Sequence, residues 1–353
     1  MFLRKLKVEN IRNLAVVDVE PFPGLNVVYG SNGAGKTSLL EAIVVLSRGR
    51  SFRTNQATEL IGPKGDVFRV FSESCHKNDI THRLGVERSS RHWRARKDGV
   101  ELTQLSQLTR DLPLVLMEPN SHLLVSGTPE FRRKYLDWGM FHVKQEFLDI
   151  HRQYSKILKQ RNAALRFQKE DLLDSIDDVL IKLGVRLGEY RKQHFEAISS
   201  RVTTLLYDLN PKIAAVELFY NNGWKSDSFE LSLRDSRKRD LVRGVTGNGP
   251  HRADISIKKD GVEARTVLSR GEQKVLSAAF LLAQGQVLGR EGDKPILLLD
   301  DLASEFDQKN FERVLDKSMD CGDQVWITGA RNPNLDFERK VFHVERGLIQ
   351  EMV

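Results

Sequence analysis

Cysteine and long apolar runs are scarce in this chain, and their scarcity excludes several classes of protein. The 353 residues include two cysteines, Cys75 and Cys321, and neither stands in C-x-x-C spacing. This argues against a disulfide scaffold or a zinc site and suits the reducing cytoplasm. The longest apolar stretches, such as residues 275–283, fall far short of the ~20 residues that a membrane span needs. The basic first residues lack the apolar core of a signal peptide, so we expect a cytoplasmic protein without a membrane partner.

Positive charge is concentrated in one stretch. The net charge is +7, and residues 48–97 alone hold twelve Lys or Arg against five Asp or Glu, so the remainder sums to zero. A local cationic surface favours an anionic polymer, most simply nucleic acid. The alternative is a basic hairpin that is merely solvated.

Residues 24–43 carry the strongest motif. A short apolar strand runs into GSNGAGKT, which fits G-x-x-x-x-G-K-[ST], and apolar residues at helical spacing follow. Glycines at this point let successive N–H groups surround a phosphate, so the motif predicts an ATP site. We expect Lys36 to reach the β- and γ-phosphates and the Thr37 hydroxyl to ligate Mg²⁺. The predicted nucleotide-binding residues are Gly30, Ser31, Asn32, Gly33, Ala34, Gly35, Lys36, Thr37 and Ser38.

A second apolar strand, residues 295–299, ends in Asp300 and Asp301. In a P-loop protein this is the Walker B strand, whose first acid, Asp300, holds Mg²⁺. Asp301 then polarises the attacking water, and we predict that Asp301 and Lys36 are catalytic. Related ATPases usually place Glu at the second position. Because Asp is one methylene shorter, we expect slow hydrolysis.

Two further motifs flank Walker B. Leu268 to Gln273 (LSRGEQ) resembles the LSGGQ signature of ABC and SMC ATPases. In those families the signature closes over the γ-phosphate held by the other subunit, which assigns Ser269, Arg270, Gly271 and Glu272 to a partner's nucleotide. Asp307, in SEFD, matches the D-loop, and Thr328 stands where a switch histidine usually lies. No Q-loop glutamine is identified.

The order of predicted elements indicates an α/β protein with two lobes. Short strands occupy much of residues 2–117, and helical patterns run from about 128 to 169 and from about 172 to 209. A strand is expected at 212–220, a helix at 229–243, a strand pair at 254–267 and a helix at 273–288. We therefore predict an ATPase head of mixed sheets formed by residues 1–118 and 241–353, with a compact helical arm at 119–240.

Further stretches extend the likeness to known ATPases over nearly the whole chain. They are VENIRN, GSNGAGKTSLLEAI, GRSFR at 49–53, RRKYLDW at 132–138, GPHRAD at 249–254, LSRGEQKVLSAAFLLAQ at 268–284 and LLLDDLASEFD at 297–307. About 230 residues separate the G-x-x-x-x-G-K-[ST] motif, called Walker A, from the signature. That gap is too long for an ABC transporter subunit and too short for an SMC protein. In these motifs the chain resembles the RecF family of recombination mediators, which are ABC/SMC-like P-loop ATPases.

The resemblance implies a function as well as a fold. It implies a DNA-repair ATPase that forms a homodimer on binding ATP and clamps double-stranded DNA, a gap or a junction. With RecR and RecO as partners, such a protein helps to load RecA at gaps during DNA replication, repair and the SOS response. The hydrolysis it implies is weak and DNA-stimulated, and serves as a switch.

The DNA surface is a separate prediction from the local charge. The first candidates are Arg91, Arg94 and Arg96, which cluster around Trp93, followed by Arg48, Arg50 and Arg53. The competing hypothesis is an ABC-type motor module that acts on a protein or membrane partner. His251, in GPHRAD, is either a packed histidine or a residue that reaches DNA or the dimer interface.

Overall fold

The computed structural model describes residues 1–353 apart from residues 55, 145, 290–292 and 353 and the side chains of residues 78 and 106. The described chain divides into two compact units. Unit 1 comprises Met1–Ser121, Asp208–Asn210 and Ala278–Val353, and unit 2 comprises His122–Tyr207 and Pro211–Ser277. The chain therefore returns to unit 1 at Ala278, later than the predicted residue 241.

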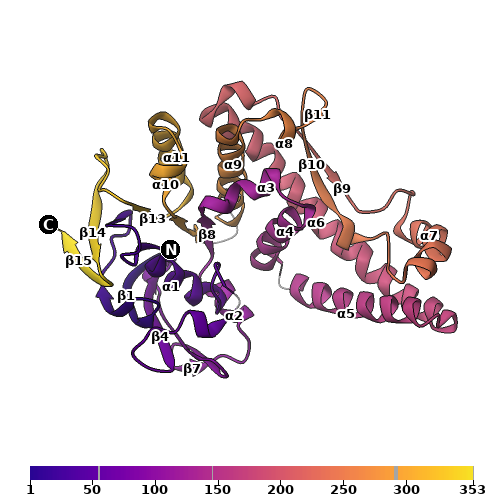
Figure 1. Cartoon of the computed structure of the whole chain (residues 1–353), viewed down its shortest axis with the longest axis horizontal. Coiled ribbons are helices and arrows are strands. Elements are labelled where there is room, and N and C mark those ends of the chain that lie inside the picture. Colours follow the sequence, from indigo (N-terminus) through magenta and orange to yellow (C-terminus); the bar gives the residue numbers. More distant parts are fainter. Residues whose placement is uncertain (55, 145, 290–292, 353) are drawn as a thin grey trace. The chain divides into compact units, whose positions relative to one another are not determined.

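Unit 1 holds most of the strands (Figure 1). Its elements are β1 (Phe2–Ile11), β2 (Leu14–Val19), β3 (Leu25–Tyr29), α1 (Lys36–Arg48), β4 (Val67–Cys75), β5 (Thr81–Ser89), β6 (Trp93–Lys97), β7 (Val100–Glu101), α2 (Ser106–Asp111), β8 (Leu114–Met117), β12 (Ile296–Leu299), α10 (Leu302–Glu305), α11 (Gln308–Cys321), β13 (Gln324–Gly329), β14 (Arg339–Glu345) and β15 (Leu348–Met352).

These strands form two six-stranded sheets. One is antiparallel, in the order β2-β1-β4-β5-β6-β7. The other, β15-β14-β3-β13-β12-β8, is parallel except for its edge strand β15. Its central strands are buried on both faces and read as continuous apolar runs, as parallel strands do.

Helix α1 is the centre of the unit 1 core. Eleven of its thirteen residues are buried, and its apolar side chains join the inward faces of both sheets in one cluster. The polar Glu41 is fully buried within it, where Arg12 forms a bidentate ion pair at 2.9 and 3.0 Å. Because α1 is held on both sides, the loop that precedes it is also fixed in place.

Unit 2 holds the long helices. Its elements are α3 (Leu123–Ser126), α4 (Pro129–Val143), α5 (Phe147–Arg166), most of α6 (Leu173–Leu209), β9 (Glu217–Asn221), α7 (Phe229–Arg243), β10 (Asp254–Lys259), β11 (Val262–Glu263), α8 (Ala264–Val267) and the start of α9 (Arg270–Leu288). The three strands pair antiparallel in the order β11-β10-β9. The main core of the unit joins apolar residues of α4, α5, α6 and α7.

The α/β class is confirmed, and several local predictions need correction. The expected helix over 128–169 is two helices, because Lys144 has extended backbone angles of −127° and 113° and ends α4. Pro211–Ile213 is a 3₁₀ turn, so the strand expected from 212 begins at Glu217. The end of the expected strand pair, residues 264–267, is helical.

Candidate functional site

The glycine-rich loop leaves β3 and enters α1 in a conformation that needs its glycines. At Gly30 an added Cβ would lie 2.1 Å from the Val344 carbonyl oxygen. Gly33 has a φ of +78°, where residues with side chains are strained. Lys36 is 8% exposed, and its Nζ donates to the Gly30 and Ser31 carbonyls at 2.8 and 3.0 Å. The lysine thus turns back over the loop, so the loop and its cation form one compact unit.

Four strands of the parallel sheet end at the same edge as this loop. Thr328 of β13 pairs with Val28 of β3, and Asp300 and Glu118 directly follow Leu299 and Met117, the last paired residues of β12 and β8. Thr37 Oγ1 donates to the two Asp300 carboxylate oxygens at 3.0 and 3.1 Å. The predicted Mg²⁺ residues, Thr37 and Asp300, are therefore in direct contact. A hydroxyl oxygen beside a carboxylate suits this hard cation.

Thr328 organises both aspartates of the Walker B strand. Its Oγ1 donates to Asp300 Oδ1 at 2.7 Å and accepts the Asp301 main-chain N–H at 2.8 Å. Asp301 has a φ of +52°, and its Oδ2 accepts a hydrogen bond from Ser304 Oγ at 2.6 Å. Burial and the Asp301 charge raise the pKa of Asp300. Thr328 cannot transfer a proton as histidine does. Its two hydrogen bonds fix the Asp300 carboxylate and the Asp301 main chain.

Glu118 is a residue of this edge that the sequence analysis missed. It follows β8, whose Met117 carbonyl accepts the Asp300 N–H at 2.8 Å. Burial raises the pKa of Glu118, and the Asp300 charge raises it further. The charge of Arg53 opposes both shifts, so Arg53 acts on the two carboxyls. No local motif marks Glu118, because its neighbourhood is set by pairing between β8 and β12.

Glu118→Gln is expected to raise the melting temperature of the unliganded protein by a few degrees at neutral pH. The folded pKa of Glu118 lies above its ordinary 4.5, so its ionised form destabilises the fold and its protonated form does not. The gain should therefore vanish below pH 4.5. Thermal unfolding against pH measures it, with the exposed Glu59→Gln as control. An equal gain in acid would show that charge is not the cause.

The signature segment folds as a capping box at the start of α9. The Ser269 N–H and Oγ donate to Glu272 Oε2 at 2.8 and 2.9 Å, and the Glu272 N–H donates back to Ser269 Oγ at 3.3 Å. This S-x-x-E pattern extends the helix to Arg270, three residues before the predicted start. Arg270 and Gly271 are exposed beside it. The helix N-terminus that we expected to receive a partner's phosphate is thus occupied by the chain's own carboxylate.

The D-loop aspartate also caps a helix. Asp307 Oδ1 accepts the Asn310 N–H at 2.8 Å at the start of α11, and its Oδ2 accepts the Asn310 side chain at 2.9 Å. Asp307 itself is exposed. Within the described residues, no group of three or more His, Cys, Asp or Glu is arranged to hold a metal ion. Any Mg²⁺ site here therefore needs oxygens from a nucleotide or water besides Thr37 and Asp300.

Comparisons with known proteins show the family of the chain. The family model described as the RecF/RecN/SMC N terminal domain matches residues 2–347. A DNA replication and repair protein RecF of Stenotrophomonas maltophilia (strain R551-3) is 38% identical over 94% of each chain. Its counterpart in Thioalkalivibrio sulfidiphilus (strain HL-EbGR7) is 37% identical over 99% of each. The chain belongs to the RecF family.

Solved structures extend the likeness to three dimensions. A structure of the recombination mediator protein RecF with ATP, in the RecFOR pathway, has a TM-score of 0.88 and 27% identity, and covers 100% of this chain and 98% of that one. An Smc head bound to the C-winged helix domain of ScpA has a TM-score of 0.60 at 16% identity, which is a likeness of fold alone. The ATPase-head fold is therefore that of RecF and SMC heads.

No helix in the described part of this RecF-family chain has the length and apolar character that a membrane crossing requires.

Several basic residues of this stretch of the RecF-family chain are paired with acids. On the outer face of the antiparallel sheet, Arg69 pairs with Glu9 and Glu87, at 3.3 and 2.7 Å. Arg94 lies 3.8 Å from Glu101. Arg91, in a turn, and Arg96, on β6, are exposed. The local excess of positive charge is therefore weaker than the composition of residues 48–97 implies, since several partners lie outside that stretch.

The second group of predicted DNA-binding arginines lies beside the edge of the parallel sheet that carries Asp300 and Glu118. Burial lowers the pKa of Arg48 to about 10, and the charge of Arg50 lowers it as well. Arg50 and Arg53 are exposed, and Arg53 acts on Glu118 and Asp300. These positions suit a role beside the phosphates better than a surface across which DNA lies.

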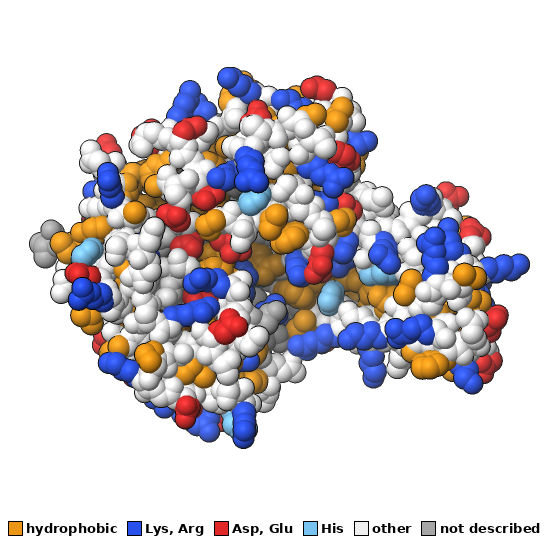
Figure 2. Space-filling model, viewed as in Figure 1, with side chains coloured by type: hydrophobic (Ala, Val, Ile, Leu, Met, Phe, Trp, Pro, Cys, Tyr) orange, Lys and Arg blue, Asp and Glu red, His pale blue; other side chains and the backbone are white. Residues whose placement is uncertain are grey.

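Unit 2 carries a basic stripe that the sequence analysis missed. Arg152, Lys156 and Lys159 are exposed on α5 at i, i+4 and i+7, so they share one face of the helix. Figure 2 shows Lys and Arg side chains gathered over the part of unit 2 that contains α5. The spacing of these three residues can be seen in the sequence. Only the bounds of α5 show that they lie on one helix and therefore form a stripe.

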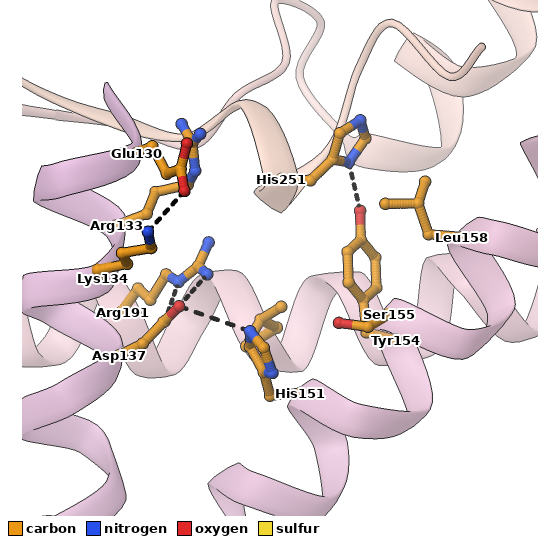
Figure 3. A pocket seen from close by; sticks show the side chains of 11 residues that line it. Glu130, Arg133, Lys134, Asp137, His151, Tyr154, Ser155, Leu158, Arg191 and His251 are labelled. Carbon is orange, nitrogen blue, oxygen red and sulfur yellow. Dashed lines mark hydrogen bonds and ion pairs between the residues drawn. The ribbon is translucent and has the colours of Figure 1, made fainter. Parts of the chain in front are cut away.

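The GPHRAD segment is held by buried contacts within unit 2 (Figure 3). Tyr154 and His251 are joined by a 2.7 Å hydrogen bond at Nδ1, and His251 Nε2 lies 3.1 Å from the Thr246 carbonyl. Because that carbonyl only accepts, Nε2 carries the proton and the Tyr154 hydroxyl donates. Burial lowers the pKa of His251 to about 4. Arg191, paired with Asp137, also donates to the Pro250 carbonyl. Of our two interpretations of His251, these contacts favour the packed histidine.

Proposed function

We propose that this chain is an ATP-dependent, DNA-binding recombination mediator of the RecF type, whose ATP-bound dimer clamps DNA. One observation carries the proposal: Thr37 of the glycine loop bonds Asp300, 263 residues away in the sequence. The two halves of a P-loop site thus meet in the folded chain. The names of the relatives, which are DNA replication and repair proteins, and a solved RecF bound to ATP support the same function.

The nucleotide site follows from the residues of the loop. The main-chain N–H groups of residues 30–38 surround the phosphates, and Lys36 turns from the loop carbonyls to the γ-phosphate. Thr37 and Asp300 would hold Mg²⁺, which would neutralise charge on the phosphate oxygens. A cation beside Asp300 would favour its ionised form, so the raised pKa of Asp300 is expected to fall.

Hydrolysis is slow in this proposal. Asp301 is the acid that orients and deprotonates the attacking water, yet its Oδ2 is bonded to Ser304 Oγ at 2.6 Å. This bond restrains the short side chain and engages one of its two carboxylate oxygens. Asp301 therefore slows hydrolysis in this proposal. The protein is a weak ATPase that DNA stimulates, and hydrolysis serves as a switch.

The dimer uses the signature segment of one chain to close the nucleotide site of the other. Ser269 and Gly271 would contact the partner's γ-phosphate, with Arg270 beside it, and Asp307 would lie along the same interface. Glu272 holds the same Ser269 donors that the phosphate needs. Glu272 therefore opposes dimerisation until ATP is bound in the partner, since two anions cannot share one helix N-terminus.

Double-stranded DNA, including a gap or junction, is the proposed partner of the dimer. The α5 stripe supplies lysine and arginine to phosphates, and Arg91 and Arg96 supply further cations. Such contacts are salt-sensitive and read little sequence. RecO and RecR are proposed as partners in a cytoplasmic pathway that loads RecA at gaps.

Molar mass in solution, with and without ATP and Mg²⁺, tests this proposal. The wild type is expected to double its mass with ATP, and Ser269→Arg is expected to stay monomeric. Glu272→Gln removes the competing charge and should dimerise at a several-fold lower protein concentration. Glu263→Gln, another exposed acid of unit 2, is the control. A wild-type mass that ATP does not change would refute the dimer.

A further inference from the structure

A row of three residues crosses the outer face of the antiparallel sheet. Phe71 of β4 lies opposite Gly85 of β5, and Gly85 lies opposite Arg96 of β6. Cross-strand partners share a face, so the aromatic ring, the gap left by glycine and the guanidinium lie side by side. Together with Thr81, Arg83, Asp98 and Gly99 they line a hollow of about 600 Å³. This is within the range of sites for small ligands.

The rows on either side are closed by ion pairs. Arg69 and Glu87 pair at 2.7 Å on one side, and Arg83 and Glu73 pair at 3.1 Å on the other. Within the described residues Arg96 has no carboxylate within 4.0 Å. Glu101 lies opposite Arg96 on β7, but its Oε1 lies 3.8 Å from Arg94 Nε. Arg96 is thus the exposed cation of this row that is available to a ligand.

The acid that lines the hollow is already engaged. Asp98 Oδ1 accepts the Arg83 main-chain N–H at 2.8 Å, and its Oδ2 lies 2.7 Å from His82 Nδ1. Asp98 therefore forms no ion pair with Arg96, and an anionic group of a ligand is favoured beside the Arg96 guanidinium.

Gly85 has no structural need to be glycine. Its φ lies outside the left-handed region, and an added Cβ would meet only Phe71 Cδ2, at 4.0 Å. Glycine inside a strand is destabilising relative to alanine, because it loses more backbone freedom on folding. The missing side chain weakens the strand and, in return, leaves one side of the Phe71 ring uncovered.

We propose that this hollow binds one nucleotide of single-stranded DNA, with the base stacked on Phe71 and the adjacent phosphate on Arg96. Aromatic rings on a sheet face with cations beside them hold unpaired bases whatever their sequence. A base pair within a duplex hides its faces, so the hollow selects the unpaired strand. The proposal deepens the DNA-binding function proposed above, since it adds a contact to the single-stranded side of a gap.

Binding of a fluorescein-labelled oligothymidylate, followed by anisotropy at low salt, tests the site. Gly85→Val fills the hollow with a residue that favours strands, so it should keep or raise stability while weakening binding about tenfold. Phe71→Leu and Arg96→Gln should weaken binding by a similar factor. Lys64→Gln removes an exposed charge of the same unit at a residue that does not line the hollow, and should change affinity little.

The outcomes separate this site from the proposed function. ATP-dependent doubling of mass and binding to blunt duplex DNA should be unchanged in Gly85→Val, whose melting temperature shows that it is folded. Wild-type affinity for oligothymidylate in both Gly85→Val and Arg96→Gln would overturn the site and leave the ATP-dependent clamp intact. Equal weakening by Lys64→Gln would also overturn it, because general charge would then explain the binding.

Discussion

Replacement of Lys36 by methionine is expected to lower the affinity for ATP about 100-fold or more, roughly 3 kcal/mol. The Lys36 Nζ is nearly buried and donates to two loop carbonyls, so it is positioned within the loop before any phosphate arrives. Methionine keeps most of the length of the side chain and removes its charge. ATP-dependent doubling of mass should disappear with it, because the proposed dimer forms around the bound nucleotide.

Titration of a fluorescent ATP analogue and light scattering measure the two effects. Lys64→Met, an exposed lysine of unit 1, is the matched control and should behave as wild type. Asp301→Asn is expected to have the opposite effect on the dimer. It should bind ATP normally, hydrolyse it more slowly and prolong the dimer, since the water loses its base. Wild-type ATP affinity in Lys36→Met would mean that the glycine loop is not the nucleotide site.

Arg161→Met is expected to destabilise unit 2 by about 3–5 kcal/mol, because it removes one member of a buried ion network. Arg161 is fully buried, with Nε donating to Asp177 at 2.6 Å and Nη1 donating to Asp240 at 2.8 Å. Its Nη1 also donates to Thr246 Oγ1 at 2.9 Å. Without the arginine, Asp240 keeps its charge in the interior with only neutral donors around it.

Urea unfolding monitored by tryptophan fluorescence and circular dichroism measures this change. Arg186→Met is the control, because Arg186 pairs with Glu146 at 2.9 Å on the surface of the same unit. Its loss should cost less than ~1 kcal/mol, as exposed ion pairs contribute little. Equal midpoints for the two variants would show that the network adds nothing beyond packing.

Local motifs gave the correct strand, loop and helix around Lys36, since the spacing of glycines, lysine and apolar residues is set within twenty residues. The β3 strand lies where the pattern placed it, at Leu25–Tyr29. Glu118 could not be found in this way. Its place beside Asp300 depends on pairing between β8 and β12, which are far apart in the sequence.

The charge analysis overstated the local excess of positive charge for a related physical reason. Residues 48–97 carry a positive excess, but Glu9 and Glu101, outside that stretch, lie opposite its arginines in the folded sheet. Composition cannot show such neighbours. The capping box at Ser269 and Glu272 could be predicted from the sequence, since S-x-x-E is a local pattern. The same residues also resemble a signature motif, and that resemblance indicates a partner's phosphate in place of the bond within the chain.

The position of β3 also has a consequence for protein synthesis. β3 is near the N-terminus, yet its two neighbours in the sheet are β13, Gln324–Gly329, and β14, Arg339–Glu345. On the ribosome, β3 and the loop after it emerge long before either neighbour has been translated. Both edges of that apolar strand stay open in the meantime, which favours aggregation or capture by a chaperone. The nascent chain therefore has no nucleotide site until translation has passed Glu345.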